Sequence, residues 1–182
     1  MPLLITLFKI ILALLAAALA LVVGALAMNH VPLLDTPGLS ERLRVYFTTH
    51  VAELSDATQF PELQTHDDAR DAAMLYADAL RAVEKLRWEV VTHDDTQHRI
   101  EAVVTTALWK FKDDVSIRIA AQPGGGARLY ARSQSRVGRG DLGANTRHLL
   151  KLVETVGSSP SPRMTTPPLR GTPPLHTDVR VP

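Results

Sequence analysis

The richest stretch of chemically active side chains runs from Arg132 to Leu149, where a predicted strand passes into a predicted helix. Arginine binds carboxylate and phosphate groups, glycine lets the backbone approach a ligand closely, and the first N–H groups of a helix attract anions. One interpretation is therefore a site for a carboxylate, a phosphate or a lipid headgroup, formed by Arg132, Arg136, Gly138, Arg139, Gly140 and Arg147.

A structural interpretation of the same stretch is favoured over the ligand site. Asp141 is a suitable N-cap for the helix, and the glycines permit a sharp turn before it. The arginines of the strand are expected to pair with Asp113 or Asp114 across the sheet. Asn145 is expected to tie the preceding loop by hydrogen bonds. The residues assigned to this structural motif are Asp113, Asp114, Ser133, Ser135, Asp141, Gly143 and Asn145.

Catalytic and metal sites have weaker support. Ser133 or Ser135 with Asp141 and His148 would supply the residue types of nucleophilic catalysis, but no nucleophile elbow surrounds either serine. The candidate metal ligands are His93, Asp94, Asp95 and His98. They lie in a predicted polar hairpin turn, where aspartate is common without any metal. The chain contains no cysteine and neither the Walker nor the dinucleotide-binding pattern. We expect no catalytic residue, no metal and no cofactor.

Hydrophobic periodicity predicts the elements that position these residues. A helix over 69–86, capped by Thr65 or Asp67, carries an apolar stripe and turns Arg70, Asp78 and other charges to water. Strands are expected at 88–91, 99–106, 114–121 and 127–137, with a possible short strand at 63–65 and a corner at 109–111. A helix over 141–156 is expected to bury Leu142, Leu149, Leu152, Val153 and Val156.

This order predicts an α+β fold. One helix, four antiparallel strands and a second helix would form a two-layer domain with both helices on one face of the sheet. In the last strand, Leu129, Ala131, Ser133, Ser135 and Val137 share the face toward the core, and Arg132 and Arg136 lie on the other. We place this domain at residues 60–156, behind an N-terminal transmembrane helix.

The first 28 residues predict the membrane segment. Ile10–Met28 is a run of 19 residues without a charge, about 28 Å long as a helix, and Lys9 precedes it. The positive end is expected to stay in the cytoplasm. A signal anchor is favoured, and the alternative is a signal peptide cut after Ala27.

Two further segments complete the organisation. Residues 29–59 are predicted to be a juxtamembrane connector with a short helix from Glu41 to about Val51, capped by Ser40. The stripe Leu39, Leu43, Phe47 and Val51 would pack on the domain or lie on the membrane, and packing is favoured. Residues 157–182, rich in proline, serine and threonine, are predicted to be disordered.

The motifs resemble those of a known family. Phe111-Lys112-Asp113-Asp114-Val115 is followed by Arg-Ser-Gln-Ser-Arg-Val-Gly at 132–138 and by Asp-Leu-Gly-Ala-Asn at 141–145. In these motifs the chain resembles the bacterial and plastid family catalogued as domain of unknown function 1499, from about Phe60 to Val156. The resemblance implies no activity, but it implies a membrane segment or an export signal in many members.

Composition restricts the expected partners. A net charge of +1 gives no overall attraction to nucleic acid. Aromatic residues make up only 5% of the chain, so few side chains are present on which nucleic-acid bases could stack. We expect a non-catalytic module in the bacterial inner membrane with its domain in the periplasm, partnered by an envelope protein or an anionic lipid. The alternative is a small exported enzyme or carrier that acts on an anionic ligand at Arg132 and Arg136.

Overall fold

The computed structural model describes residues 1–65, 67–106 and 110–158. Its helices are α1 (Pro2–Asn29), α2 (Leu39–Thr48), the short 3₁₀ helix η1 (Pro61–Leu63), α3 (Ala72–Lys85) and α4 (Ala144–Gly157). Two expectations lie outside the described residues: the role of Trp109 in the predicted corner, and the disorder of the tail from residue 159.

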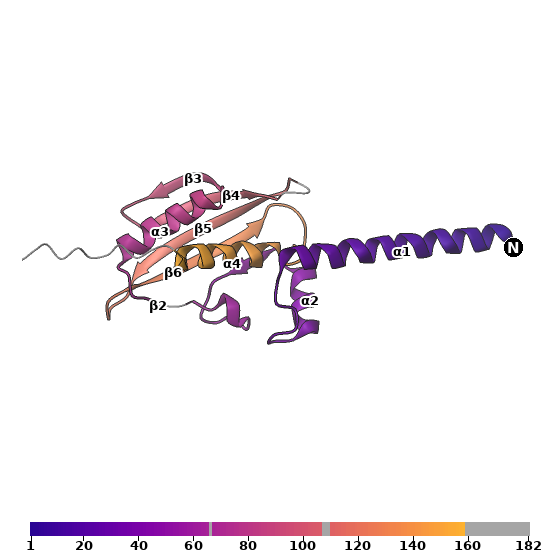
Figure 1. Cartoon of the computed structure of the whole chain (residues 1–182), viewed down its shortest axis with the longest axis horizontal. Coiled ribbons are helices and arrows are strands. Elements are labelled where there is room, and N and C mark those ends of the chain that lie inside the picture. The colour runs from indigo at the N-terminus through magenta and orange to yellow at the C-terminus, as the bar shows by residue number, and fades with distance from the viewer. Residues whose placement is uncertain (66, 107–109, 159–182) are drawn as a thin grey trace, which may run out of the picture.

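One antiparallel sheet organises the domain (Figure 1). Its strands are β1 (Val51–Glu53), β2 (Asp67–Asp68), β3 (Glu89–Asp94), β4 (Arg99–Thr105), β5 (Lys112–Ala121) and β6 (Ala127–Ser135). The order is β1-β6-β5-β4-β3, and β2 also pairs with β6. The four expected strands are confirmed as β3 to β6, and the sheet gains β1 and β2, which cover the outer edge of β6.

Alternation along the strands decides which face is buried. In β5 Val115, Ile117 and Ile119 are at most 3% exposed, whereas Asp114 is exposed. The buried face meets the apolar stripes of α3 and α4, and all three groups belong to one core. Of the α4 residues expected inside, Leu149, Leu152 and Val156 are buried. The α+β class is confirmed.

Helix α3 differs from its prediction at its start and on its polar face. Its N-cap is Asp71, whose carboxylate accepts from the N–H of Met74 at 2.7 Å, so neither Thr65 nor Asp67 caps it. Asp78 was expected to face water, but it is 1% exposed and pairs with Arg70 at 2.6 Å. Arg70 also donates to the Val156 carbonyl at 3.2 Å. The pair is buried because it links α3 to the end of α4.

Other predicted boundaries are corrected as well. Helix α2 starts after Gly38, and Val51 lies in β1 opposite Gln134 rather than at the end of that helix. Residues 61–63 form η1 in place of the possible strand at 63–65. Strand β6 stops at Ser135. Val137, at 66%, and Val153, at 41%, were expected to be inside but are exposed. The favoured packing of the α2 stripe is also wrong for Leu39 and Phe47, which are 45% and 47% exposed.

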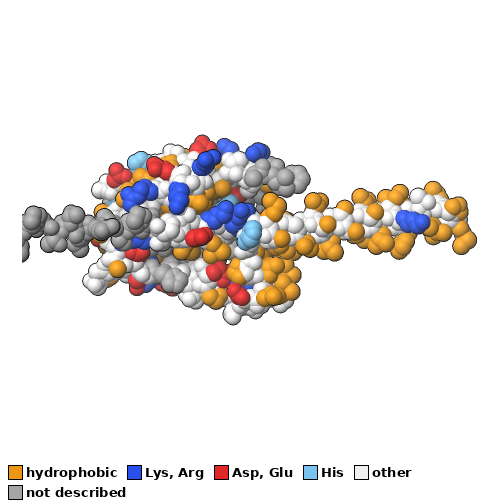
Figure 2. All heavy atoms as spheres, in the orientation of Figure 1, with side chains coloured by type: hydrophobic (Ala, Val, Ile, Leu, Met, Phe, Trp, Pro, Cys, Tyr) orange, Lys and Arg blue, Asp and Glu red, His pale blue; other side chains and the backbone are white. Residues whose placement is uncertain are grey.

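Helix α1 exposes mainly apolar side chains, and Lys9 is its one charged residue. It is 28 residues long, and its mean hydropathy over an 18-residue window is 2.9. It is the one helix in the described residues that is long and apolar enough to cross a membrane. Figure 2 shows hydrophobic side chains along its whole length, projecting away from the domain.

A second, smaller core joins α1 to the domain. Leu26 near the end of α1, Val31 in the connector and Tyr46 in α2 are each at most 8% exposed and pack together. Leu142, just before α4, packs against the same cluster. Helix α1 is therefore held by apolar contacts at the edge of the domain, beside the start of α4.

Candidate functional site

A buried polar cluster forms where β6 meets α4, and it contains much of the predicted motif. Ser133 and Ser135 face inward from β6, and Asn145 faces them from α4. The Ser133 hydroxyl donates to Asn145 Oδ1 at 2.5 Å, and Asn145 Nδ2 lies 2.9 Å from Ser135 Oγ. The same amide donates to the carbonyl of His50, just before β1, at 2.9 Å. Asn145 thus connects three elements while being fully buried.

Asp141, just before α4, accepts hydrogen bonds from backbone N–H groups at the start of this helix. Its carboxylate accepts from the N–H groups of Gly143 at 2.8 Å and Asn145 at 3.0 Å. The N-cap itself is Gly143 in the left-handed region, so the prediction that Asp141 occupies that position is wrong by two residues. Burial raises the pKa of Asp141 above its usual value. The helix terminus therefore already holds a carboxylate, the kind of group that the predicted anion site was meant to attract.

Asp113 and His148 form a second polar pair under α4. Asp113 is 1% exposed, and its carboxylate oxygens accept no hydrogen bond from the described residues. Its Oδ2 lies 3.7 Å from His148 Nδ1. Burial raises the pKa of Asp113, while the nearby Ser135 hydroxyl opposes that rise. Burial also lowers the pKa of His148 to about 4, so this ring is neutral at physiological pH.

The predicted set of serine, His148 and Asp141 is not assembled, because Asp141 is bonded to the start of α4 and the carboxylate beside His148 is that of Asp113. Nor do Ser133, His148 and Asp113 form a catalytic triad. A triad needs the carboxylate on one ring nitrogen and the nucleophile on the other. Here the Ser133 hydroxyl, at 3.4 Å, and the Asp113 carboxylate both face Nδ1 of His148. Ser133 is also completely buried, so a substrate has no access to it. The arrangement is suited to holding α4 on the sheet.

Arg132 of β6 lies on the opposite face of the sheet from this cluster, because successive side chains of a strand alternate, and Arg136 follows the strand directly. Arg136 donates to Asp114 at 2.7 Å, and this pair lowers the pKa of Asp114. Arg132 is exposed and pairs with neither Asp113 nor Asp114, and no other acidic partner is found for it among the described residues. The structure therefore does not bring Arg132 and Arg136 to the start of α4. The expected composite anion site stays a prediction, with its parts on two sides of the sheet.

The other predicted ligand residues lie in the turn and helix that follow β6. Gly138 has a φ of 97°, which only glycine adopts readily, and Arg139 next to it is exposed. Arg147 lies in the first turn of α4, half-buried, and its positive charge helps to keep His148 neutral. Gly138 and Arg139 therefore belong to the turn, and Arg147 belongs to the helix.

The turn between β6 and α4 instead meets the end of α1 and the segment that follows it. A Cβ on Gly140 would lie 2.3 Å from the carbonyl oxygen of Phe47 in α2. A Cβ on Gly143 would lie 2.9 Å from Val31. The Leu142 N–H donates to the Tyr46 carbonyl at 3.0 Å, and its own carbonyl accepts from Asn29 Nδ2 at 2.8 Å. We call residues 138–143 the docking turn, because they receive α1, the connector and α2.

Sequence reasoning missed a buried arginine beneath α2. Arg42 is 0% exposed and donates to both carboxylate oxygens of Glu62, at 2.6 and 3.0 Å. It also donates to the carbonyls of Asp35 and Thr36 and lies over the ring of Phe60 at 5.0 Å. Periodicity assigns such a charge to the solvated side of a short helix. The partner is Glu62, in the sequence Phe60-Pro61-Glu62-Leu63. Because Glu62 is 20 residues from Arg42 along the chain, local sequence patterns do not reveal the ion pair.

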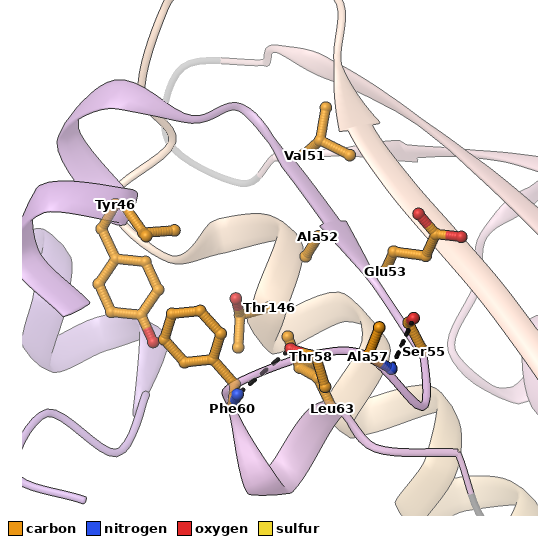
Figure 3. Close-up of a pocket in the computed structure, with 11 residues that line it drawn as sticks. Tyr46, Val51, Ala52, Glu53, Ser55, Ala57, Thr58, Phe60, Leu63 and Thr146 are labelled. Carbon is orange, nitrogen blue, oxygen red and sulfur yellow. Dashed lines mark hydrogen bonds between the residues drawn. The ribbon is translucent and has the colours of Figure 1, made fainter. Parts of the chain in front are cut away.

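A pocket of about 240 Å³ opens between α2, β1 and η1 (Figure 3). Its walls are apolar, with Tyr46 and Phe60 stacked at a centroid distance of 6.4 Å. The oxygens of Ser55 and Thr58 at its edge accept from the backbone N–H groups of Ala57 and Phe60, both at 3.2 Å. Its lining residues are Val45, Tyr46, Val51, Ala52, Glu53, Ser55, Ala57, Thr58, Phe60, Leu63 and Thr146. This lining, mainly apolar with a few hydroxyl groups, suits an apolar group.

The polar hairpin before β4 shows a local hydrogen-bond network. Asp95 accepts from the Tyr76 hydroxyl at 2.6 Å and lies 3.1 Å from His93 Nδ1. Asp94 accepts from two backbone N–H groups of the turn. Within residues 1–65, 67–106 and 110–158, no group of three or more His, Asp or Glu side chains is placed to hold a metal ion.

Comparison with known proteins identifies a matching family. A family model described as a protein of unknown function (DUF1499) matches residues 47–156. No curated protein matches the chain. The matched range begins before Phe60, where the sequence analysis starts the domain, and it therefore includes β1 as well as the docking turn and α4.

Proposed function

The chain belongs to the DUF1499 family of proteins of unknown function, and we propose that it is a membrane-anchored, non-catalytic binding module. In this proposal α1 is an uncleaved signal anchor in the bacterial inner membrane, with its N-terminus in the cytoplasm. The domain faces the periplasm and acts in envelope assembly by binding a partner.

One observation carries the non-catalytic part of the proposal. The side chains of the motif that have catalytic chemistry are buried and occupied: Ser133 is bonded to Asn145, and Asp141 to the start of α4. Such groups stabilise a fold, whereas catalysis needs a nucleophile or base that a substrate reaches. The uncleaved anchor is supported by Leu26, which lies before the alternative cleavage point and is buried against the domain.

The pocket beneath α2 is the proposed binding site. Its stacked aromatic rings and aliphatic walls fit an apolar side chain of an envelope protein, and Glu53 stands exposed at its mouth. Pockets of this kind, apolar with a few polar groups at the edge, are the usual places of ligand contact. The proposal requires the partner to approach within reach of Thr58.

In-cell photo-crosslinking tests the proposed site. A photoreactive phenylalanine analogue placed at Thr58 is expected to yield a discrete adduct of higher mass with one envelope protein. The same analogue at Val91, on the exposed side of β3, is the matched control and should yield none. Equal labelling at both positions, or none at Thr58, would refute the binding site.

Arg132 supports the alternative of an anionic ligand. It is an exposed cation on β6 without an ion-pair partner among the described residues, next to Gln134 on the uncovered face. In this alternative, sulfate or phosphate raises the melting temperature of the full chain saturably, and Arg132→Ala abolishes that rise. Protection that is equal in both proteins would remove this alternative.

A further inference from the structure

Helix α2 and the connector before it present uncovered apolar side chains next to the base of α1. Leu34 is 82% exposed, Leu39 45% and Phe47 47%. Arg42 and Tyr46 bury the adjacent side of α2, and Leu34, Leu39 and Phe47 belong to neither core. Figure 2 shows hydrophobic side chains gathered beside the point where α1 leaves the domain.

The length of the apolar run in α1 fixes where the membrane ends. A hydrocarbon core of about 30 Å needs about 20 helical residues. Lys9 must remain at the cytoplasmic edge of that core, so the span runs from about Ile10 to about Asn29. Snorkelling of the Lys9 side chain shifts the span by about one turn toward the amino terminus. In both positions the last turns of α1 lie in the outer half of the membrane or at its surface.

Those last turns are the part of α1 that α2 contacts. Val22 and Leu26 belong to the same cluster as Tyr46 and Leu43 of α2. At 1.5 Å per residue, Leu26 lies about 5 Å and Val22 about 10 Å inward from Asn29 along the helix axis. Amphipathic helices that rest on a membrane bury their apolar face about 5–10 Å into the boundary between headgroups and acyl chains. Helix α2 is therefore held at the depth that such helices occupy.

We propose that α2 lies in the periplasmic interface of the membrane that α1 spans, with Leu34, Leu39 and Phe47 inserted among the acyl chains. The partner is the lipid bilayer itself, recognised through apolar contact rather than charge. Arg44, an exposed cation of α2, is paired with Glu41 at 2.5 Å, which leaves no basic cluster to select anionic headgroups. The docking turn keeps α2 at this height, because Gly140 touches the end of α2 and Leu142 bonds to Tyr46.

This inference rests on the proposed anchoring, and site-directed spin labelling separates the two. The chain has no cysteine, so single-cysteine variants carry one label each. The labelled positions are Leu39→Cys and Phe47→Cys on α2, Leu15→Cys within the span, and Val91→Cys on β3 as the matched exposed control. Each full-length variant is reconstituted in vesicles of a zwitterionic phospholipid. Accessibility to oxygen, which is concentrated in lipid, is compared with accessibility to a water-soluble nickel complex.

The oxygen-to-nickel ratio at positions 39 and 47 is expected to exceed that at position 91 several-fold and to fall below that at position 15. Aqueous accessibility at 39 and 47 equal to that at 91, with position 15 in lipid, would overturn the α2 proposal and leave the anchor intact. An aqueous ratio at position 15 would overturn the anchoring. A defined distance between two Phe47→Cys labels, lost on dilution with unlabelled protein, would show that a second copy covers this face and would also overturn the proposal.

Melting temperature keeps the test independent of folding defects. All four substitutions are at side chains at least 45% exposed, so each variant should melt within a few degrees of the natural chain. As a second readout, Phe47→Trp fluorescence is expected to be quenched by brominated lipid more strongly than Val91→Trp fluorescence. Equal quenching at both positions would count against insertion in the same way.

Discussion

Replacing Gly140 by alanine tests whether the docking turn holds α1 and α2 against the domain. A Cβ at this position would lie 2.3 Å from the Phe47 carbonyl oxygen and 2.7 Å from that of Tyr46. Both atoms belong to the backbone at the end of α2, which cannot rotate away as a flexible side chain does. The φ of Gly140 is not in the left-handed region, so the substitution introduces steric overlap without backbone strain.

Overlap of this kind costs about 1–3 kcal/mol in a packed core. For a domain of this size the melting temperature is expected to fall by roughly 4–15 °C. The assay is thermal unfolding of the full chain in nanodiscs, followed by circular dichroism. Limited proteolysis of residues 29–38 provides a second measurement, because α2 must move away from the docking turn and expose this connector to cleavage.

Gly124→Ala is the matched control. Nothing lies within 4 Å of a Cβ at Gly124, and its φ is also outside the left-handed region. The control should therefore retain its melting temperature within about 1 °C, or gain slightly from the lower entropy of its unfolded chain. A Gly140→Ala protein that melts like the Gly124→Ala protein would refute the reasoning. If the Gly140→Ala protein kept its melting temperature but lost binding of sulfate or phosphate, the docking turn would be a ligand site.

Three further predictions concern the polar groups that the fold buries. Asn145→Ala should lower the free energy of unfolding by about 2–3 kcal/mol, because it leaves the His50 carbonyl and the Ser133 hydroxyl without their partner; denaturant unfolding measures this, with Lys151→Ala as the exposed control. Arg42→Ala should cost about 3 kcal/mol by leaving Glu62 unpaired, and Arg42→Ala combined with Glu62→Ala should recover part of that loss; a double variant no more stable than Arg42→Ala would contradict the pairing. The pKa of His148 is lowered to about 4 in the folded chain, so the unfolded chain binds a proton that the folded chain excludes as the pH falls from about 6.5 to about 4. The free energy of unfolding of the natural chain therefore falls by up to about 3 kcal/mol between about pH 6.5 and about pH 4 because of His148. The His148→Gln protein lacks this loss. The buried carboxyls with raised pKa values gain stability as the pH falls, and they do so in both proteins, so the comparison of the two proteins isolates His148; parallel pH curves would contradict the prediction.

The sequence predicts the domain well where local periodicity decides the structure. Strand alternation places Ser133 on the inner face and Arg132 on the outer face, and the structure has both there. The apolar stripe of α3 is found as predicted. The edge strands β1 and β2 are two or three residues long, too short for a pattern of period two. They exist because β6 offers an unpaired edge, which is a property of the assembled sheet.

The candidate site could be predicted only in part. Asn145 and Asp141 were assigned structural roles, but the partner that most distinguishes Asn145 is the carbonyl of His50, 95 residues away. Gly140 was read as a place for a ligand, whereas the backbone of α2 comes close to it. Local sequence identifies a position that needs glycine. It does not identify what approaches that position, because the approaching backbone carries no side-chain signal.

The docking turn holds the domain against α1 and α2. The most direct test is the distance between spin labels at Ala27→Cys, near the end of α1, and Lys151→Cys, on the exposed side of α4, measured by double electron–electron resonance in nanodiscs. Both side chains are exposed, so the labels leave the contacts intact. A single narrow distance distribution that Gly140→Ala broadens is the predicted result. A distribution that is already broad with Gly140 in place would mean a flexible tether and would contradict the account.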